Sequence, residues 1–249
     1  CSNGIPEAFD AYKIVQISDL HDAQIGENNE KLIAMTAETE PDCIVLTGDF
    51  VDSSRFHPER SLSVAESLVK IAPVYYVSGN HEAILPDEDY QALTDGLRGL
   101  GVCVLEDESA EVTRDGQSIR LIGLTDIGFH PGTLEEKKDA LRTALSALLP
   151  EDEFSVTLAH RPELMDVYTE CGAPLVLSGH AHGGQIRLPG IGGLIAPGQG
   201  LFPKYTDGKY EENGTTLVVS RGIGNSVLPL RVNNRPQIVV VQLACNYRM

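Results

Sequence analysis

Short apolar runs alternate along the chain with longer segments of mixed apolar and polar residues. In the first third, Tyr12–Ile17, Cys43–Thr47 and Val74–Ser78 are almost continuously apolar and rich in β-branched or aromatic residues. Runs of this length and composition are typical of strands that are buried on both faces. We therefore predict three buried strands in this part of the chain.

The segments between these strands predict helices. Asn28 or Asn29 can cap the first helix, which should run to about Glu40 because a proline follows. A second helix should extend from about Glu59 to Lys70. A third should open at Asp87, where three acidic residues in a row favour a helix N-terminus. This strand-helix-strand rhythm predicts parallel strands with right-handed crossovers.

The pattern changes in the middle of the chain, where shorter strands are expected. Asp115-Gly116 is a strong hairpin signal between Glu111–Thr113 and Ile119–Leu124, and an amphipathic helix should follow from Leu134 to Leu149. The other expected strands are Val102–Leu105, Phe154–Ala159, Leu175–Ser178, Thr215–Ser220 and Gln237–Leu243. The last two should close a second sheet. Residues 183–200 hold seven glycines and two prolines and predict a loop.

Five of the expected strands end in a residue of a type that binds metals. These residues are Asp19, Asp49, Asn80, His160 and His180. In α/β proteins, sites gather at the carboxyl ends of strands, where the loops converge. Asp19 and His21 are two residues apart, so in an extended stretch both side chains would leave the same face. The sequence therefore predicts a metal site.

The fragments around these residues supply ample ligands for two divalent metals: two carboxylates, an amide and four imidazoles. They read Ser18-Asp19-Leu20-His21, Gly48-Asp49-Phe50-Val51-Asp52, Gly79-Asn80-His81-Glu82, Ala159-His160-Arg161-Pro162 and Gly179-His180-Ala181-His182. In this order they resemble the calcineurin-like metallophosphoesterases, whose pattern is D-x-H, G-D-x-x-D, G-N-H-[D/E], H and G-H-x-H. Three further segments, residues 5–10, 183–189 and 220–226, resemble a bacterial branch of that family.

The resemblance implies a fold and a ligand set. The fold would be a four-layer α-β-β-α sandwich of two mixed sheets, formed by one domain over residues 1–249 with residues 1–10 as an N-terminal extension. Asp19, His21 and His182 would hold a first metal, Asp49 would bridge both metals, and Asn80, His160 and His180 would complete the second. Such ligands accept Mn, Fe, Zn, Co or Ni, so the identity of the metals stays open.

Other residues of the motifs are expected to act beside the metals. By resemblance, His81 would contact the phosphate and protonate the leaving oxygen. Asp52 would orient the loop or a ligand, and Glu82 would either orient His81 or support the residues behind it, unless it only caps a helix. Four arginines suit bidentate phosphate contact, although salt bridges are the commoner role in so acidic a chain. They are Arg161, Arg187, Arg221 and Arg231.

The expected activity is the hydrolysis of a phosphomonoester or phosphodiester by a hydroxide that bridges two metals and attacks phosphorus in line. One alternative is a lipid- or nucleotide-linked pyrophosphate hydrolase, which would need an apolar groove or cap beside the site. The other is a non-catalytic metal-binding scaffold, which would usually lack a ligand or the histidine at position 81. The chain has no G-x-x-x-x-G-K-[ST] motif, so a P-loop kinase or NTPase is excluded.

Charge and cysteine content narrow the partners. The net charge is −17, from 19 basic and 36 acidic residues, which disfavours a nucleic-acid partner and leaves a small phosphoester as the expected substrate. The five cysteines include no C-x-x-C pair, so no disulfide framework is expected. No apolar run approaches the length of a transmembrane helix.

The first residue is a cysteine, and members of the resembled branch often carry a membrane anchor or export signal ahead of this point. We therefore expect the protein to work outside the cytoplasm. Any membrane association should need an N-terminal segment that precedes Cys1, because a charge of −17 opposes adhesion to anionic lipid. The oligomeric state stays open.

Overall fold

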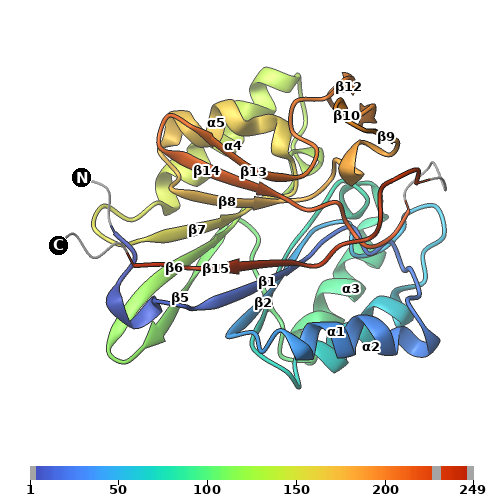
Figure 1. Ribbon diagram of the computed structural model, residues 1–249, viewed down its shortest axis with the longest axis horizontal. Coiled ribbons are helices and arrows are strands. Elements are labelled where there is room, and N and C mark those ends of the chain that lie inside the picture. Colours follow the sequence, from blue (N-terminus) through green and yellow to red (C-terminus); the bar gives the residue numbers. More distant parts are fainter. Residues whose placement is uncertain (1–3, 226–230, 246–249) are drawn as a thin grey trace.

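The computed structural model describes residues 4–225 and 231–245. Two sheets pack face to face, and helices cover the outer face of each, so that the layers run helix, sheet, sheet, helix (Figure 1). This confirms the expected α/β sandwich of two mixed sheets. No helix within the described residues is long and apolar enough to cross a membrane.

The first sheet has the strand order β15-β1-β2-β3-β4, in which only β15 is antiparallel to its neighbour. Its strands are β1 (Lys13–Ile17), β2 (Cys43–Thr47), β3 (Val74–Val77), β4 (Cys103–Val104) and β15 (Val239–Gln242). The helices that cover this sheet are α1 (Glu30–Glu38), α2 (Pro58–Leu68) and α3 (Asp87–Gly99). This part of the chain also holds the short 3₁₀ turns η1 (Glu7–Phe9), which packs between the sheets, η2 (Glu27–Asn29) and η3 (Glu82–Ile84).

The second sheet has the order β13-β14-β8-β7-β6-β5, with antiparallel pairs at both edges and parallel pairs between them. Its strands are β5 (Glu108–Arg114), β6 (Gln117–Gly123), β7 (Ser155–Leu158), β8 (Leu175–Ser178), β13 (Gly208–Glu212) and β14 (Thr215–Val219). The helical elements here are α4 (Leu134–Leu148), α5 (Met165–Cys171), η4 (Ile127–Phe129), η5 (Pro162–Leu164) and η6 (His182–Gly184).

The core is divided by the two sheets into three apolar layers. Along β1, Ile14 packs between the sheets while the next residue, Val15, packs against the helices, so both faces of the strand are buried. This explains why the strand is a continuous apolar run. Gln16 is the polar exception: its side-chain amide donates to Thr47 Oγ1 at 2.9 Å and to the Ser178 carbonyl at 2.8 Å. It thereby links the first sheet to the second near the carboxyl ends of β1, β2 and β8.

The predicted hairpin is confirmed. Asp115 and Gly116 both have positive φ, 50° and 76°, and they join β5 to β6. A two-residue turn with two left-handed residues matches the right-handed twist of the paired strands, which is why Asp-Gly favours it.

The expectation that residues 237–243 close the second sheet is wrong. They form β15, which pairs antiparallel with β1 in the first sheet, with Val240 opposite Val15. After β14 the chain crosses over the end of β1, where the amides of Ile223 and Gly224 donate to the carbonyls of Ser18 and Asp19. The returning segment therefore runs back along the free edge of β1.

Three smaller differences also have local causes. Asn29 precedes α1, but its side chain accepts from the Ile25 amide at 2.7 Å and does not cap the helix, which ends at Glu38. Strand β13 went unpredicted, because its sequence is polar and it lies at a sheet edge. The expected loop at 183–200 contains two small hairpins, formed by β9 (Arg187–Leu188) with β10 (Gly192–Gly193) and by β11 (Ile195–Ala196) with β12 (Gly200–Leu201).

Candidate metal centre

The structure brings all seven expected ligands together at the carboxyl ends of the strands. Asp19 and His21 follow β1, Asp49 follows β2, Asn80 follows β3, and the remaining three follow β7 and β8. Two groups have ligand atoms within 4.8 Å of one another: Asp19, His21, Asp49 and His182, and Asp49, His160 and His180. Asn80 Oδ1 joins the second group, 3.2 Å from His160 Nε2.

Asp49 lies between the two groups. Its Oδ1 accepts the backbone N–H of His81 at 2.8 Å, which fixes the carboxylate. Its Oδ2 is 3.6 Å from Nε2 of His21 and 3.2 Å from Nε2 of His160. One oxygen therefore faces an imidazole from each group, which is the position that a bridging carboxylate requires.

The site is built on strained backbone. Five of the seven expected ligands have positive φ: Asp19, His21, Asp49, His180 and His182. For residues other than glycine this conformation is uncommon, and it tends to persist where the surrounding structure imposes it at functional sites. The premise that Asp19 and His21 lie in an extended stretch is therefore wrong. Their side chains converge because each residue turns sharply.

The glycines of the motifs allow this close approach. A Cβ on Gly179 would lie 1.9 Å from Ser18 Oγ and 2.3 Å from Asp19 Oδ2. A Cβ on Gly79 would lie 2.4 Å from both the amide nitrogen and Oδ1 of Asp49. A side chain at Gly179 would push the second sheet away from the end of β1, and a side chain at Gly79 would displace Asp49 within the first sheet.

The residues present fit two cations. The Nε2 atoms of His21 and His182 face each other at 3.2 Å, and His180 Nε2 is buried with no hydrogen-bond partner in the described part of the chain. Burial lowers the pKa of His21 and of His182 to about 4, so both imidazoles are neutral at pH 7 and can donate a lone pair. Buried lone pairs that converge without donors between them are the arrangement that a divalent cation satisfies.

His160 differs from the other imidazoles. Burial is the largest single influence and lowers its pKa, but the charge and hydrogen bond of Asp49, together with the charges of Asp19 and Asp126, outweigh it and raise the pKa to about 10. Nδ1 lies 2.8 Å from the Thr47 carbonyl and donates to it, so Nε2 is the atom that faces Asp49. A backbone carbonyl that fixes the second nitrogen is the usual support of a metal-binding histidine.

We expect metal binding to displace the proton of His160. A raised pKa means that this proton stabilises the metal-free protein below pH 6.5 and that the stabilisation is lost as the pH rises through about 10. Metal affinity should therefore increase with pH up to that point. In calorimetric titration with Mn²⁺ at pH 8, in two buffers of different ionisation enthalpy, the wild-type protein should release about one proton per chain more than His160→Asn, because any proton lost by metal-bound water is common to both proteins. Equal proton release by the two proteins would contradict the assignment.

Glu82 supports the loops behind Asp49, and among the described residues it has no hydrogen bond or ion pair with the His81 side chain. Its buried carboxylate accepts four backbone N–H groups, from Asp49 (2.9 Å), Phe50 (2.7 Å), Val51 (3.2 Å) and Gly79 (2.7 Å). Glu82 therefore holds the loop after β2 against the loop after β3. Burial and the nearby Asp49 charge raise the pKa of Glu82 to about 7, and cations at Asp49 would act in the opposite direction.

Replacing Glu82 with glutamine should loosen this loop. The glutamine amide nitrogen cannot accept, so two of the four buried amides lose their acceptor at about 1–3 kcal/mol each. Metal affinity should fall about 10- to 100-fold, because Asp49 moves with the loop. Urea unfolding and metal titration would measure both effects. The exposed Glu66→Gln on α2 is the matched control, and a Glu82→Gln protein with wild-type stability would overturn this role.

Asp52 and His81 lie together beside the first group. The His81 ring packs edge-on against His21 with centroids 4.4 Å apart, and its Nδ1 is 3.2 Å from the Ser53 amide and 3.7 Å from Asp52 Oδ1. Because the Ser53 N–H donates to Nδ1, the proton of a neutral His81 lies on Nε2. Asp52 itself accepts from the amide and hydroxyl of Ser54 and pairs with Arg55. Sequence reasoning missed Ser53, because its contact comes from the fold of the loop.

Three of the four arginines are paired with acids. Arg161 makes a bidentate contact with Asp126 at 2.7 and 3.0 Å, and Arg187 and Arg221 both pair with Asp207. Arg231 instead donates to the Arg221 carbonyl and contacts Nδ1 of His182 at 3.2 Å. These arginines hold the loops around the site in place.

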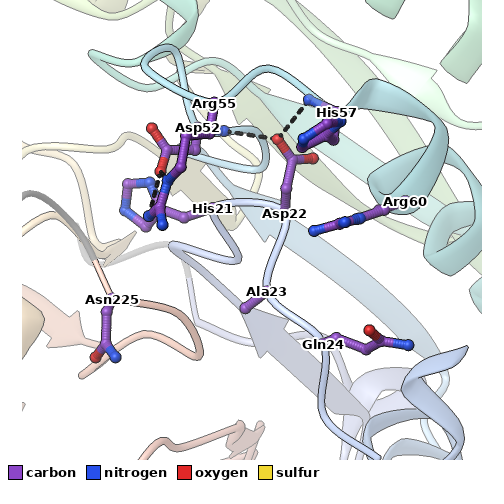
Figure 2. A pocket seen from close by; sticks show the side chains of 9 residues that line it. All are labelled: His21, Asp22, Ala23, Gln24, Asp52, Arg55, His57, Arg60 and Asn225. Atoms are coloured by element: carbon purple, nitrogen blue, oxygen red, sulfur yellow. Dashed lines mark hydrogen bonds and ion pairs between the residues drawn. The ribbon is translucent and has the colours of Figure 1, made fainter. Parts of the chain in front are cut away.

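A cavity of about 290 Å³ adjoins His21 (Figure 2). Its polar lining includes Asp22, Asp52 and the cations Arg55 and Arg60. The Asp22 carboxylate is already used, since it accepts from the amides of Asp52 and His57 and from the Ser61 hydroxyl. Arg60 has no ion-pair partner among the described residues, so its charge is available to a bound molecule.

Comparison with known proteins agrees with this geometry. Residues 12–184 match the sequence profile of the calcineurin-like phosphoesterases. The chain belongs to this family. It is 31% identical to the uncharacterized metallophosphoesterase YkuE of Bacillus subtilis, over 97% of this chain and 82% of that protein. It is 29% identical to the phosphodiesterase YaeI of Escherichia coli, over 93% and 82% of the two chains.

Among solved structures, a dimetal phosphatase from Danio rerio has the same fold, with a TM-score of 0.52 and 14% identity over 86% of this chain and 88% of that one. As a calcineurin-like phosphoesterase, the protein is a hydrolase of phosphoesters that uses two divalent metals. Which expected ligand binds which metal stays a prediction.

Proposed function

We propose that the chain, acting as one domain, hydrolyses phosphodiesters to phosphomonoesters at the two groups around Asp49. The observation that carries this proposal is the Asp49 Oδ2 atom, which faces one imidazole of each group. The name of the Escherichia coli relative, a phosphodiesterase, supports the diester as substrate. The full set of expected ligands and His81 argues against the alternative of a non-catalytic scaffold.

The residues around the two ligand groups would have three roles: metal binding, proton donation and substrate binding. Two divalent metals, when bound, supply Lewis-acid activation of water and of the phosphoryl oxygens. Asp19, His21, Asp49 and His182 would hold the first, and Asp49, Asn80, His160 and His180 the second. His81 would donate its Nε2–H towards the leaving oxygen, since Nδ1 is occupied by the Ser53 amide. The cavity beside His21 would take a polar part of the substrate, with Arg60 free to meet a negative charge.

The test is turnover against metal content. Protein reconstituted with Mn²⁺ should hydrolyse bis(4-nitrophenyl) phosphate faster than 4-nitrophenyl phosphate, lose the activity on chelation and regain it when Mn²⁺ returns. A panel of pyrophosphate diesters tests the remaining alternative. Failure to hydrolyse any phosphoester with two metals bound per chain would overturn the proposal.

An extracytoplasmic location remains a prediction. Fractionation of the full-length protein in its native host would test it. Recovery in the soluble cytoplasm would contradict it without affecting the catalytic proposal.

A further inference from the structure

Exposed apolar side chains gather on the two small hairpins that follow the last ligand motif. Large apolar residues are commonly exposed singly, but contiguous groups mark interaction surfaces. Ile191, Leu201 and Phe202 are 63%, 67% and 64% exposed, and three more partly exposed apolar residues lie on or beside the same hairpins. The additional residues are Leu188, Ile195 and Val232. We call residues 188–202 the apolar hairpins.

The segment also carries no charge. Residues 188–202 contain no acidic or basic side chain, in a chain whose net charge is −17. These residues therefore add no negative charge that would oppose contact with a lipid headgroup layer. The flanking Arg187 of β9 pairs with Asp207, and the Glu163 carboxylate beside Gly198 is largely buried. Phe202 adds a second sign of function: it is exposed although its φ is 55°, a conformation that costs free energy for an aromatic residue.

The base of the hairpins is fixed to the metal centre. The Leu194 amide donates to the carbonyls of Gly184 and Ile186, at 3.1 and 2.8 Å, and Gly184 ends η6, which begins at His182. Gly184 and Gly193 pack so closely that a Cβ on Gly184 would lie 2.4 Å from Gly193 Cα. In Figure 1 β9, β10 and β12 lie together at the upper right, beyond strands β8, β13 and β14 of the second sheet.

We propose that the apolar hairpins dock the protein on a lipid surface, without the segment ahead of Cys1 that the sequence led us to expect for membrane association, and that its substrate is an amphiphilic phosphoester cleaved there. The substrate class rests on the phosphoesterase function proposed above. Apolar tips of this kind enter a bilayer by about 5–10 Å, to the boundary between headgroups and acyl chains. With the tips inserted, the metal centre at their base would face the phosphate of a lipid headgroup. No large cap over the site is needed to shield an acyl chain, because the chain stays in the lipid.

Vesicle binding tests the surface. The metal-loaded protein should co-float with phosphatidylcholine vesicles, and added salt should not release it, because the contact is apolar and not electrostatic. The double variant Leu201→Ser, Phe202→Asn should bind at least about 10-fold more weakly. Asparagine is chosen at 202 because it tolerates a positive φ. Met35→Ser, which removes an apolar side chain 52% exposed on α1, should bind as the wild type does.

Turnover tests the substrate class. The hexadecyl 4-nitrophenyl phosphodiester in phosphatidylcholine vesicles should be cleaved faster than the methyl ester in solution, and the double variant should lower this ratio about 10-fold. If neither ester is cleaved, the proposed function fails. If the methyl ester is cleaved but the vesicles are not bound, the docking surface is overturned while the function stands. Concentration-dependent dimers without vesicle binding would likewise overturn it and assign the hairpins to a second copy of the chain.

Discussion

Replacement of Asp49 by asparagine should remove both metals and lower kcat/KM by on the order of 10³-fold or more. The side chains are nearly the same size, and Oδ1 of asparagine can still accept the His81 amide. The charge at Oδ2 is lost, however, and this atom faces both His21 and His160. Because Asp49 belongs to both groups, the single substitution should affect both cations.

Asp19→Asn gives the contrast that makes this result specific. Asp19 lies in the first group only, where its carboxylate accepts the His180 amide and is 3.4 Å from Nε2 of His182. This variant should lose one metal and retain the second. The exposed Asp95→Asn on α3 is the control and should keep both metals and full turnover. Metal analysis of the three proteins decides the matter: an Asp49→Asn protein that retains two metals would disprove the bridging position.

Replacement of His81 by alanine should separate chemistry from metal binding. His81 is not among the expected ligands, so both metals should remain. If its Nε2–H protonates the leaving oxygen, turnover of an alkyl ester should fall about 10²- to 10⁴-fold, because an alkoxide leaves poorly without a proton. A 4-nitrophenyl ester should lose much less, since 4-nitrophenolate leaves without help.

Ser53→Ala is the matched variant for His81. It removes the hydroxyl, 3.1 Å from Nδ1, but keeps the backbone N–H that donates to the same atom. Its effect on alkyl esters should therefore be far smaller than that of His81→Ala. Equal losses for alkyl and nitrophenyl esters in His81→Ala would show that the imidazole contacts a phosphoryl oxygen instead. Loss of both metals would show that His81 is a ligand.

Asp49→Asn and His81→Ala change two residues that contact each other in the metal centre. The His81 backbone N–H donates to Asp49 Oδ1, and the His81 ring packs against His21. The backbone of this residue therefore positions a metal ligand, while its side chain is placed to act on the substrate. His81→Ala removes only the ring. Its metal content therefore reports directly on whether the backbone alone positions Asp49.

The sequence by itself determined the alternation of strands and helices, the Asp115-Gly116 hairpin and the type of residue at the end of each site strand. These features are local: a buried strand needs an unbroken apolar run, and a tight hairpin needs two residues that accept positive φ. The order of the five fragments was also enough to indicate the metallophosphoesterase family, because it matches the motif pattern of that family in all five blocks.

The tertiary structure alone decided which segments meet. The sheet that β15 joins depends on the crossing of Ile223 and Gly224 over β1, which no periodicity records. The partners of Glu82 were out of reach for the same reason, since they include backbone amides of a loop more than thirty residues away in the chain. The sequence of the apolar hairpins predicted only a glycine-rich loop, and the tertiary structure decides which of their side chains stay exposed. Contacts between distant segments are set by the packing of the whole chain, and a local pattern carries no record of them.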